Sequence, residues 1–193
     1  MLQIRWHGRG GQGAVTAARI FGLAAAVYGG WYAQSFPSFG TERRGAPVTA
    51  FTRLDDRPIR DRSQIANPNY IVVLDATLLE NTDVFAGLAP GGIVLINSNR
   101  KVINDRENRD NCVLSRSGFH YLDATHLARE VLGVPIVNTA MVGALAGLSG
   151  LLPVEAVTRA IAGVLPERLA ARNSDVARQA FDLMAGLATI EAE

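Results

Sequence analysis

Cysteine and histidine are scarce in this chain, and their scarcity excludes several kinds of site. Cys112 is the only cysteine among 193 residues, and a single thiol cannot form an intramolecular disulfide, bind an iron–sulfur cluster or supply a zinc ribbon. The three histidines, His7, His120 and His126, have no spacing typical of a metal site. We therefore expect no metal site and no catalytic residues here, so that any redox centre lies on another chain.

Long apolar runs and a charge excess are also missing. The uncharged stretches 20–41 and 131–154 are interrupted by proline and polar residues, and neither offers the run of about 20 apolar residues that a spanning helix needs. No signal peptide is evident. The formal net charge of +1 argues against a protein that binds nucleic acid or membrane surfaces, because both need a large basic excess. We expect a cytoplasmic protein without a membrane span.

Acidic residues are nearly absent from the N-terminal quarter. Before Asp55 the chain has one acid, Glu42, and six arginines: Arg5, Arg9, Arg19, Arg43, Arg44 and Arg53. The segment "HGRGGQG" (7–13) lies inside this basic region. A glycine cluster typically marks a backbone that comes close to a ligand, and the surrounding charge favours an anionic one.

The order of apolar segments predicts an α/β fold. We expect strands at 2–7, 47–54, 70–74 and 93–97, with short ones near 112–115 and 119–122. We expect helices at 12–28, 77–87, 123–132 and 139–148, the last capped by Asn138, and two more beginning at Pro153 and Pro166. Residues 31–46 should be an extended segment and a loop, and 100–111 a surface excursion.

This pattern predicts that residues 1–193 form one three-layer, Rossmann-like domain. Its sheet should be mostly parallel, with antiparallel strands allowed, and its last third should be helical. Ligands bind such sheets at the C-terminal ends of the strands, where the glycine cluster lies.

Several interpretations of the glycine cluster stay open from the residues alone. Gly8, Gly10 and Gly13 match the dinucleotide fingerprint G-x-G-x-x-G between a strand and a helix. The acid that should bind the adenosine ribose about 20 residues later is missing, however, because none precedes Glu42. A phosphate loop would need Lys followed by Ser or Thr after the last glycine, where Ala14 stands. An anion-binding loop without the ribose acid and a merely close-packed strand–helix junction both remain.

Two longer motifs resemble a known family. "IRWHGRGGQGAVTAARI" (4–20) and "YAQSFPSFGTERRGAPVTAFTRLDDRPIRDRSQI" (32–65) resemble the gamma subunit of 2-oxoacid:acceptor oxidoreductases, such as the pyruvate:ferredoxin oxidoreductases. The likeness continues through "NPNYIVVLDATLL" (67–79), "GGIVLINS" (91–98) and "NTAMVGALAGLSGLLPVEAV" (138–157), nearly the whole chain.

The resemblance implies a subunit of an enzyme that converts a 2-oxoacid and coenzyme A to acyl-CoA, carbon dioxide and a reduced acceptor. It implies thiamine diphosphate, Mg and iron–sulfur clusters on partner subunits, which agrees with the single Cys112. Those partners would be alpha, beta and ferredoxin-like delta subunits, with a flavin subunit where NAD is reduced. This gamma-type chain would be inactive alone and would help to bind coenzyme A, whose phosphates suit the basic N-terminal quarter.

The coenzyme A site is expected at two facing loops. The pyrophosphate or nucleotide end would meet the first loop, at a helix N-terminus that offers free N–H groups. Glu42 would orient the arginine pair of the second loop. The residues of the site are Gly8, Arg9, Gly10, Gly11, Gln12 and Gly13 in the first loop, and Gly40, Glu42, Arg43 and Arg44 in the second.

Two alternatives accompany this assignment. In the first, salt bridges to a neighbouring subunit are formed by Glu42, Arg43 and Arg44. In the second, the protein is a free-standing Rossmann-type NAD-dependent oxidoreductase, for which His7 is the only nearby acid–base group. Asp75, at the end of a predicted strand, is expected to cap the next helix. The aromatic stretch "WYAQSFPSF" (31–39) is expected to contact another subunit, because aromatics are favoured at interface cores.

Overall fold

A mixed sheet forms the centre of the computed structural model, which describes residues 1–38, 44–99 and 118–190. Within these residues six strands follow the order β2-β3-β1-β4-β5-β6. They are β1 Leu2–Arg9, β2 Tyr32–Pro37, β3 Pro47–Asp55, β4 Tyr70–Val73, β5 Ile93–Asn97 and β6 Gly118–Leu122. Strands β1, β4, β5 and β6 are parallel, whereas β3 is antiparallel to both of its neighbours. The prediction of an α/β fold with a mostly parallel sheet is confirmed.

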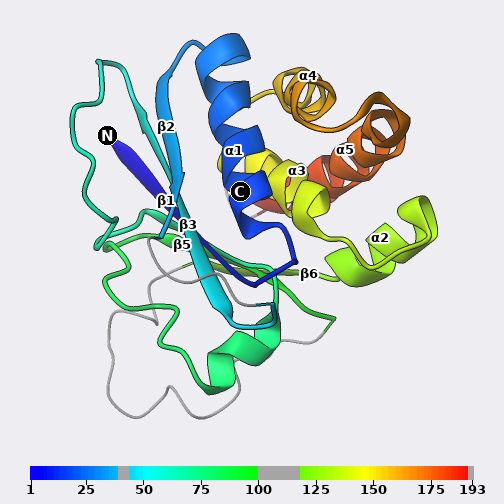
Figure 1. Cartoon of the computed structure of the whole chain (residues 1–193), viewed down its shortest axis with the longest axis horizontal. Helices are drawn as coiled ribbons and strands as arrows, with labels where there is room; N and C mark the ends of the chain where they lie inside the picture. Colours follow the sequence, from blue (N-terminus) through cyan, green and yellow to red (C-terminus); the bar gives the residue numbers. More distant parts are fainter. Residues whose placement is uncertain (39–43, 100–117, 191–193) are drawn as a thin grey trace.

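The α-helices gather on one side of this sheet (Figure 1). They are α1 Ala14–Leu23, α2 Ala124–Leu132, α3 Asn138–Ser149, α4 Val154–Val164 and α5 Glu167–Ile190. A π-helical turn, η1 Ala24–Tyr28, continues α1 and ends before Gly30, whose φ is +74°. The last three helices make the C-terminal portion helical, as predicted.

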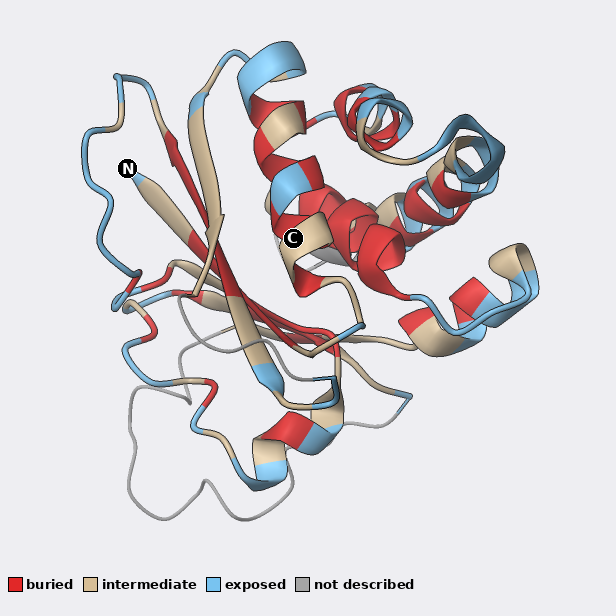
Figure 2. Cartoon of the chain, in the orientation of Figure 1, coloured by how far each residue is buried: buried red, intermediate tan, exposed pale blue. Residues whose placement is uncertain are grey.

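Small residues bring the helices close together. Gly143 and Gly147 of α3 lie directly against the backbone of Ala177 and Phe181 in α5, so a side chain at either glycine would collide with a carbonyl. Helix α3 is buried almost throughout and fills the space between the sheet and α5 (Figure 2). In the main core, Trp6 of β1 packs against Phe21 of α1 with ring centroids 5.7 Å apart. Strand β1 is thus held at the middle of the sheet, and the glycine loop follows from its end.

Among the residues that the structure describes, the opposite face of the sheet is covered without an α-helix, and here the expected helix over 77–87 is wrong. The structure has a 3-10 helix, η2 Ala76–Glu80, followed by turns. Val84 and Leu88 pack against β4 and β5 in a second apolar cluster. The buried Arg5 of β1 donates hydrogen bonds to the carbonyls of Val84 and Ala86. These carbonyls therefore bind a side chain from the sheet instead of the N–H groups of a helix.

Some predicted boundaries also differ. Helix α1 begins at Ala14 instead of residue 12, because Gly11 and Gly13 have φ values of +96° and +82°. Asn138 does not cap α3 but is its first residue, after Val137. Asp75 caps η2 as expected, since its side chain accepts a hydrogen bond from the Thr77 N–H. The predicted excursion at 100–111 and strand at 112–115 lie outside the described residues.

Candidate functional site

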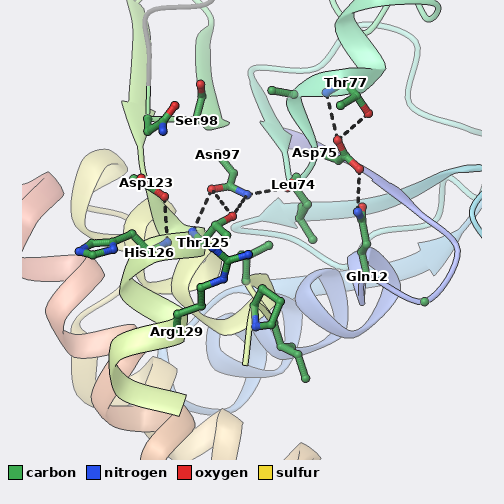
Figure 3. A pocket seen from close by; sticks show the side chains of 16 residues that line it. Gln12, Leu74, Asp75, Thr77, Asn97, Ser98, Asp123, Thr125, His126 and Arg129 are labelled. Atoms are coloured by element: carbon green, nitrogen blue, oxygen red, sulfur yellow. Dashed lines mark hydrogen bonds between the residues drawn. The ribbon is translucent and has the colours of Figure 1, made fainter. Parts of the chain in front are cut away.

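A cavity of about 750 Å³ opens at the C-terminal ends of the parallel strands. Four strand ends contribute to it, because parallel strands that point the same way bring the segments that follow them to one edge of the sheet. Its lining consists of residues 11–12 after β1, 74–77 after β4, 97–99 after β5, the segment 135–137, and Asp123, Thr125, His126 and Arg129 after β6. The predicted location of the site thus coincides with this cavity, which has polar side chains on both sides (Figure 3).

Gly8, Gly11 and Gly13 of the first loop differ in what surrounds them. A Cβ at Gly8 would lie 3.2 Å from the Ala14 Cβ, so Gly8 lets β1 approach the start of α1. A Cβ at Gly13 would lie 2.5 Å from the Asn138 Nδ2, so Gly13 lets α3 pack against this junction. Gly11 differs from both, because no atom lies within 4 Å of the position of a Cβ there. Gly11 also lines the cavity, so its open backbone faces the site, one residue after the second glycine of the fingerprint.

Gln12 ties the glycine loop to the end of β4. Its Oε1 accepts a hydrogen bond from the Arg9 N–H at 2.7 Å, and its Nε2 donates to the Asp75 Oδ2 at 2.7 Å. The Arg9 guanidinium lies 3.2 Å from the same Asp75 oxygen and donates to the Thr77 Oγ1 at 2.8 Å. Arg9 thus holds the loop through Asp75 and Thr77, and its contact with a ligand stays a prediction.

The carboxylate of Asp75 is held in its charged form. Burial raises its pKa, but hydrogen bonds from Thr77 and Gln12 and the charge of Arg9 lower it more, so that the pKa lies below the ordinary value. The positive charge of the adjacent Arg9 guanidinium offsets part of the repulsion that this carboxylate would exert on an anion nearby. Asp123 is likewise engaged, because it accepts a hydrogen bond from the His126 N–H at 2.8 Å.

The end of the second predicted loop lies beside the first. Gly10 and Arg44 form a β-bridge, in which the Gly10 N–H donates to the Ala46 carbonyl at 2.8 Å and the Gly45 N–H donates to the Gly10 carbonyl at 3.1 Å. Arg44 is exposed next to the glycine loop. Gly40, Glu42 and Arg43 lie outside the described residues. The structure therefore brings the two loops together at Arg44, and ligand contact by the arginine pair stays a prediction.

Residues on the far side of the cavity were not predicted. The Asn97 Nδ2 donates to the Leu74 carbonyl at 2.9 Å and lies 3.0 Å from the Thr125 Oγ1, which joins the ends of β4 and β5 to the start of α2. Arg129 lines the cavity from α2, and its guanidinium has no ion pair within the part of the chain that the structure describes. The sequence does contain a pattern that could have indicated this side of the cavity. Polar residues directly follow apolar strands in "INS" (96–98) and "YLDAT" (121–125).

His7 does not support an acid–base role at this site. It is buried on β1, away from the cavity lining, and its Nε2 accepts a hydrogen bond from the Arg5 Nε at 3.0 Å. Burial, and secondarily the charge of Arg5, lowers its pKa to about 3. His7 is therefore neutral near pH 7.

Neither a metal site nor a membrane span is found in residues 1–38, 44–99 and 118–190. No group of three or more His, Cys, Asp and Glu side chains there could hold a metal ion. None of the helices in these ranges is both long enough and apolar enough to cross a bilayer.

Comparison with known proteins identifies the family. Residues 3–183 match the model of the pyruvate ferredoxin/flavodoxin oxidoreductase family. The chain is 48% identical over 182 residues to the pyruvate synthase subunit PorC of Methanothermobacter thermautotrophicus, which covers 94% of this chain and 95% of that protein. It is 47% identical to the common gamma subunit of the pyruvate/ketoisovalerate oxidoreductases of Thermococcus litoralis, over 94% of this chain and 96% of that protein.

A solved structure agrees with this result. The crystal structure of the pyruvate oxidoreductase subunit PORC of Thermotoga maritima is 35% identical, matches with a TM-score of 0.72, and covers 94% of this chain and 95% of that one. The chain therefore belongs to the pyruvate ferredoxin/flavodoxin oxidoreductase family. Within that family it is a gamma subunit of a pyruvate/2-oxoacid:ferredoxin oxidoreductase complex. The predicted family and function are confirmed, and the alternative of a free-standing NAD-dependent oxidoreductase is not supported.

Proposed function

We propose that this chain binds the nucleotide end of coenzyme A in the cavity at the strand ends. The open backbone of Gly11 carries the proposal, because it leaves space for a pyrophosphate at the N-terminus of α1. The described residues fit such a group, since the Arg9 guanidinium lies beside the acidic Asp75 and Arg129 adds a cation without an ion pair in the described chain.

The two ends of the cavity suit two anionic parts of one ligand. Coenzyme A carries a pyrophosphate and a separate 3′-phosphate. The pyrophosphate would meet residues 8–13, with Arg43 and Arg44 contributing from the second loop, while Arg129 would attract the 3′-phosphate from α2. Gln12, Asp75 and Arg9 would act through the loop, by holding its backbone in the shape that admits the ligand.

The redox chemistry would take place on other subunits. Thiamine diphosphate, when bound, supplies the carbanion chemistry of decarboxylation, and iron–sulfur clusters carry the electrons. One cysteine, Cys112, cannot ligate a cluster, so we assign these groups and Mg to alpha, beta and ferredoxin-like delta subunits. This chain would accordingly be inactive alone, and a flavin subunit would be needed where NAD is the acceptor. We also assign the complex to the cytoplasm.

Titration calorimetry on the assembled complex tests the proposal. Coenzyme A and NAD are titrated separately into wild type, Arg129→Ala and Arg178→Ala, the last an exposed arginine of α5 that lines neither this cavity nor its neighbourhood. We expect coenzyme A to bind, NAD not to bind, and Arg129→Ala to weaken coenzyme A binding by about tenfold, the loss of one charge-assisted hydrogen bond. Equal affinity in all three proteins would refute the assignment of Arg129. Binding of NAD in place of coenzyme A would refute the assignment of coenzyme A as the ligand.

A further inference from the structure

A second hollow, of about 320 Å³, lies between the segment 132–138 and α5. We call it the α5 cleft. It is separate from the cavity at the strand ends, but Ile136 lines both. Its volume is near the lower limit of ligand pockets in general, about 300 Å³.

Large apolar side chains gather on its walls although they are exposed. Val134 is 43% exposed, Ile136 51% and Leu169 43%. Single exposed apolar residues are ordinary on a protein surface, but a group of them around one hollow marks an interaction site. Folding leaves this apolar area in water, and a partner that covers it would gain the corresponding free energy.

Among the described residues, the only charges that line the α5 cleft are positive. Arg168 and Arg172 stand four residues apart on α5, where like charges repel one another across one helix turn. Neither guanidinium has an ion pair within the described ranges, and no acidic residue lines the cleft. The free energy cost of this pair would fall if carboxylates approached it from outside the chain.

The Asn173 side chain, which lines the cleft, is already hydrogen-bonded within the protein. The Asn173 Oδ1 accepts a hydrogen bond from the Thr139 Oγ1 at 2.8 Å, and its Nδ2 donates to the Leu169 carbonyl at 2.8 Å. A ligand in the cleft would thus find apolar walls and two arginines at the rim. That combination matches a protein interface, with an apolar centre and a polar rim in which arginine is favoured.

We propose that the α5 cleft docks a segment of a partner subunit of the oxidoreductase complex, which presents an apolar side chain flanked by carboxylates. The chain is a subunit of such a complex, so a protein segment of complementary charge is the occupant that the positive rim and apolar walls select. The proposal depends on this membership and not on where coenzyme A binds. Because Ile136 lines both hollows, docking would also hold one wall of the strand-end cavity in place.

The test compares matched variants in the co-expressed complex. Arg172→Glu and Leu169→Ser alter the cleft, while Arg178→Glu and Leu183→Ser make the same changes at exposed positions of α5 outside it. The dissociation constant of the chain from its partner subunits is measured by dilution at low ionic strength. We expect each cleft variant to raise it at least about tenfold, and each control to change it by less than about threefold. High salt should reduce the difference between wild type and Arg172→Glu but not that for Leu169→Ser.

Three results would overturn the proposal. The first is an unchanged dissociation constant in both cleft variants with unchanged thermal unfolding. The second is an equal loss of assembly in the control variants, which would indicate a general effect of charge or polarity on α5. The third is a raised KM for coenzyme A with intact assembly, which would assign the cleft to the ligand. A lost coenzyme A site with normal docking would instead leave this proposal standing.

Discussion

Replacement of Gly11 by aspartate and by asparagine separates a ligand-binding loop from a merely structural one. Gly11 has a φ of +96°, and no atom lies within 4 Å of a Cβ placed there. Both side chains therefore fit without a collision. Each carries the cost of a left-handed backbone, about 1–2 kcal/mol, and both residues tolerate that conformation better than most. Because the two side chains have nearly the same shape, this cost cancels when the variants are compared.

The remaining difference is one negative charge that faces the cavity. At a distance of about 8 Å and an effective dielectric constant of about 40, two unit charges interact with about 1 kcal/mol. Repulsion of one phosphate charge alone should therefore raise the KM for coenzyme A about fivefold in Gly11→Asp relative to Gly11→Asn. The several charges of coenzyme A make this a lower limit. The ratio should decrease at high ionic strength, because salt screens the repulsion.

Steady-state kinetics of the assembled complex measure this ratio. The KM for the 2-oxoacid serves as the internal control, since we assign its site to other subunits. Thermal unfolding of both variants checks that they are folded to the same extent. Equal KM values for coenzyme A in the aspartate and asparagine variants would refute the reasoning, and would leave the glycine loop with a packing role only.

Three further predictions concern the arginine pair, the helix junction and the buried histidine. Arg43→Ala/Arg44→Ala should raise the KM for coenzyme A at least about tenfold, less so at high ionic strength, if the pair binds phosphate; loss of the subunit from the purified complex would instead indicate interfacial salt bridges. Gly13→Ala should lower the thermal unfolding temperature more than Gly30→Ala, because both glycines have a positive φ but only Gly13 would bring a Cβ to 2.5 Å from the Asn138 Nδ2; equal decreases would contradict this. The free energy of unfolding should fall as the pH drops from about 6.5 toward 3, because the unfolded chain protonates His7 in this range while the folded chain, with a His7 pKa of about 3, does not. Urea unfolding at pH 7 and pH 5 should show a smaller decrease for His7→Gln than for wild type, and an equal decrease would refute the role of His7.

Local sequence patterns predicted most of the strands because each strand is determined by its own apolar residues. The runs at 70–73 and 93–97 are buried on both sides in the middle of the sheet, and such strands need no polar alternation. Prolines likewise marked the starts of helices, as at Pro153 and Pro166. These features depend on residues that are adjacent in the sequence, so the sequence alone is enough to predict them.

The failed helix at 77–87 shows where local information ends. The segment has helix-forming residues, but Arg5, more than 70 positions earlier, binds two of its carbonyls. Asn138 similarly lies against Gly13, and that contact is possible only because α3 packs on the start of α1. Contacts over such separations follow from the order of the strands, which no single segment encodes.

Residue identity and spacing were enough to indicate the family, the glycine loop, the basic N-terminal quarter and the lack of cysteines for a cluster on this chain. The contacts that these residues make depend instead on the tertiary structure. It engaged Arg9 with Asp75 and Thr77, left Gly11 as the open glycine, and brought Arg129 from α2 to the same cavity. The physical reason is the parallel sheet, which places segments more than 100 residues apart at one edge and so makes hydrogen bonding and exposure there depend on the whole fold.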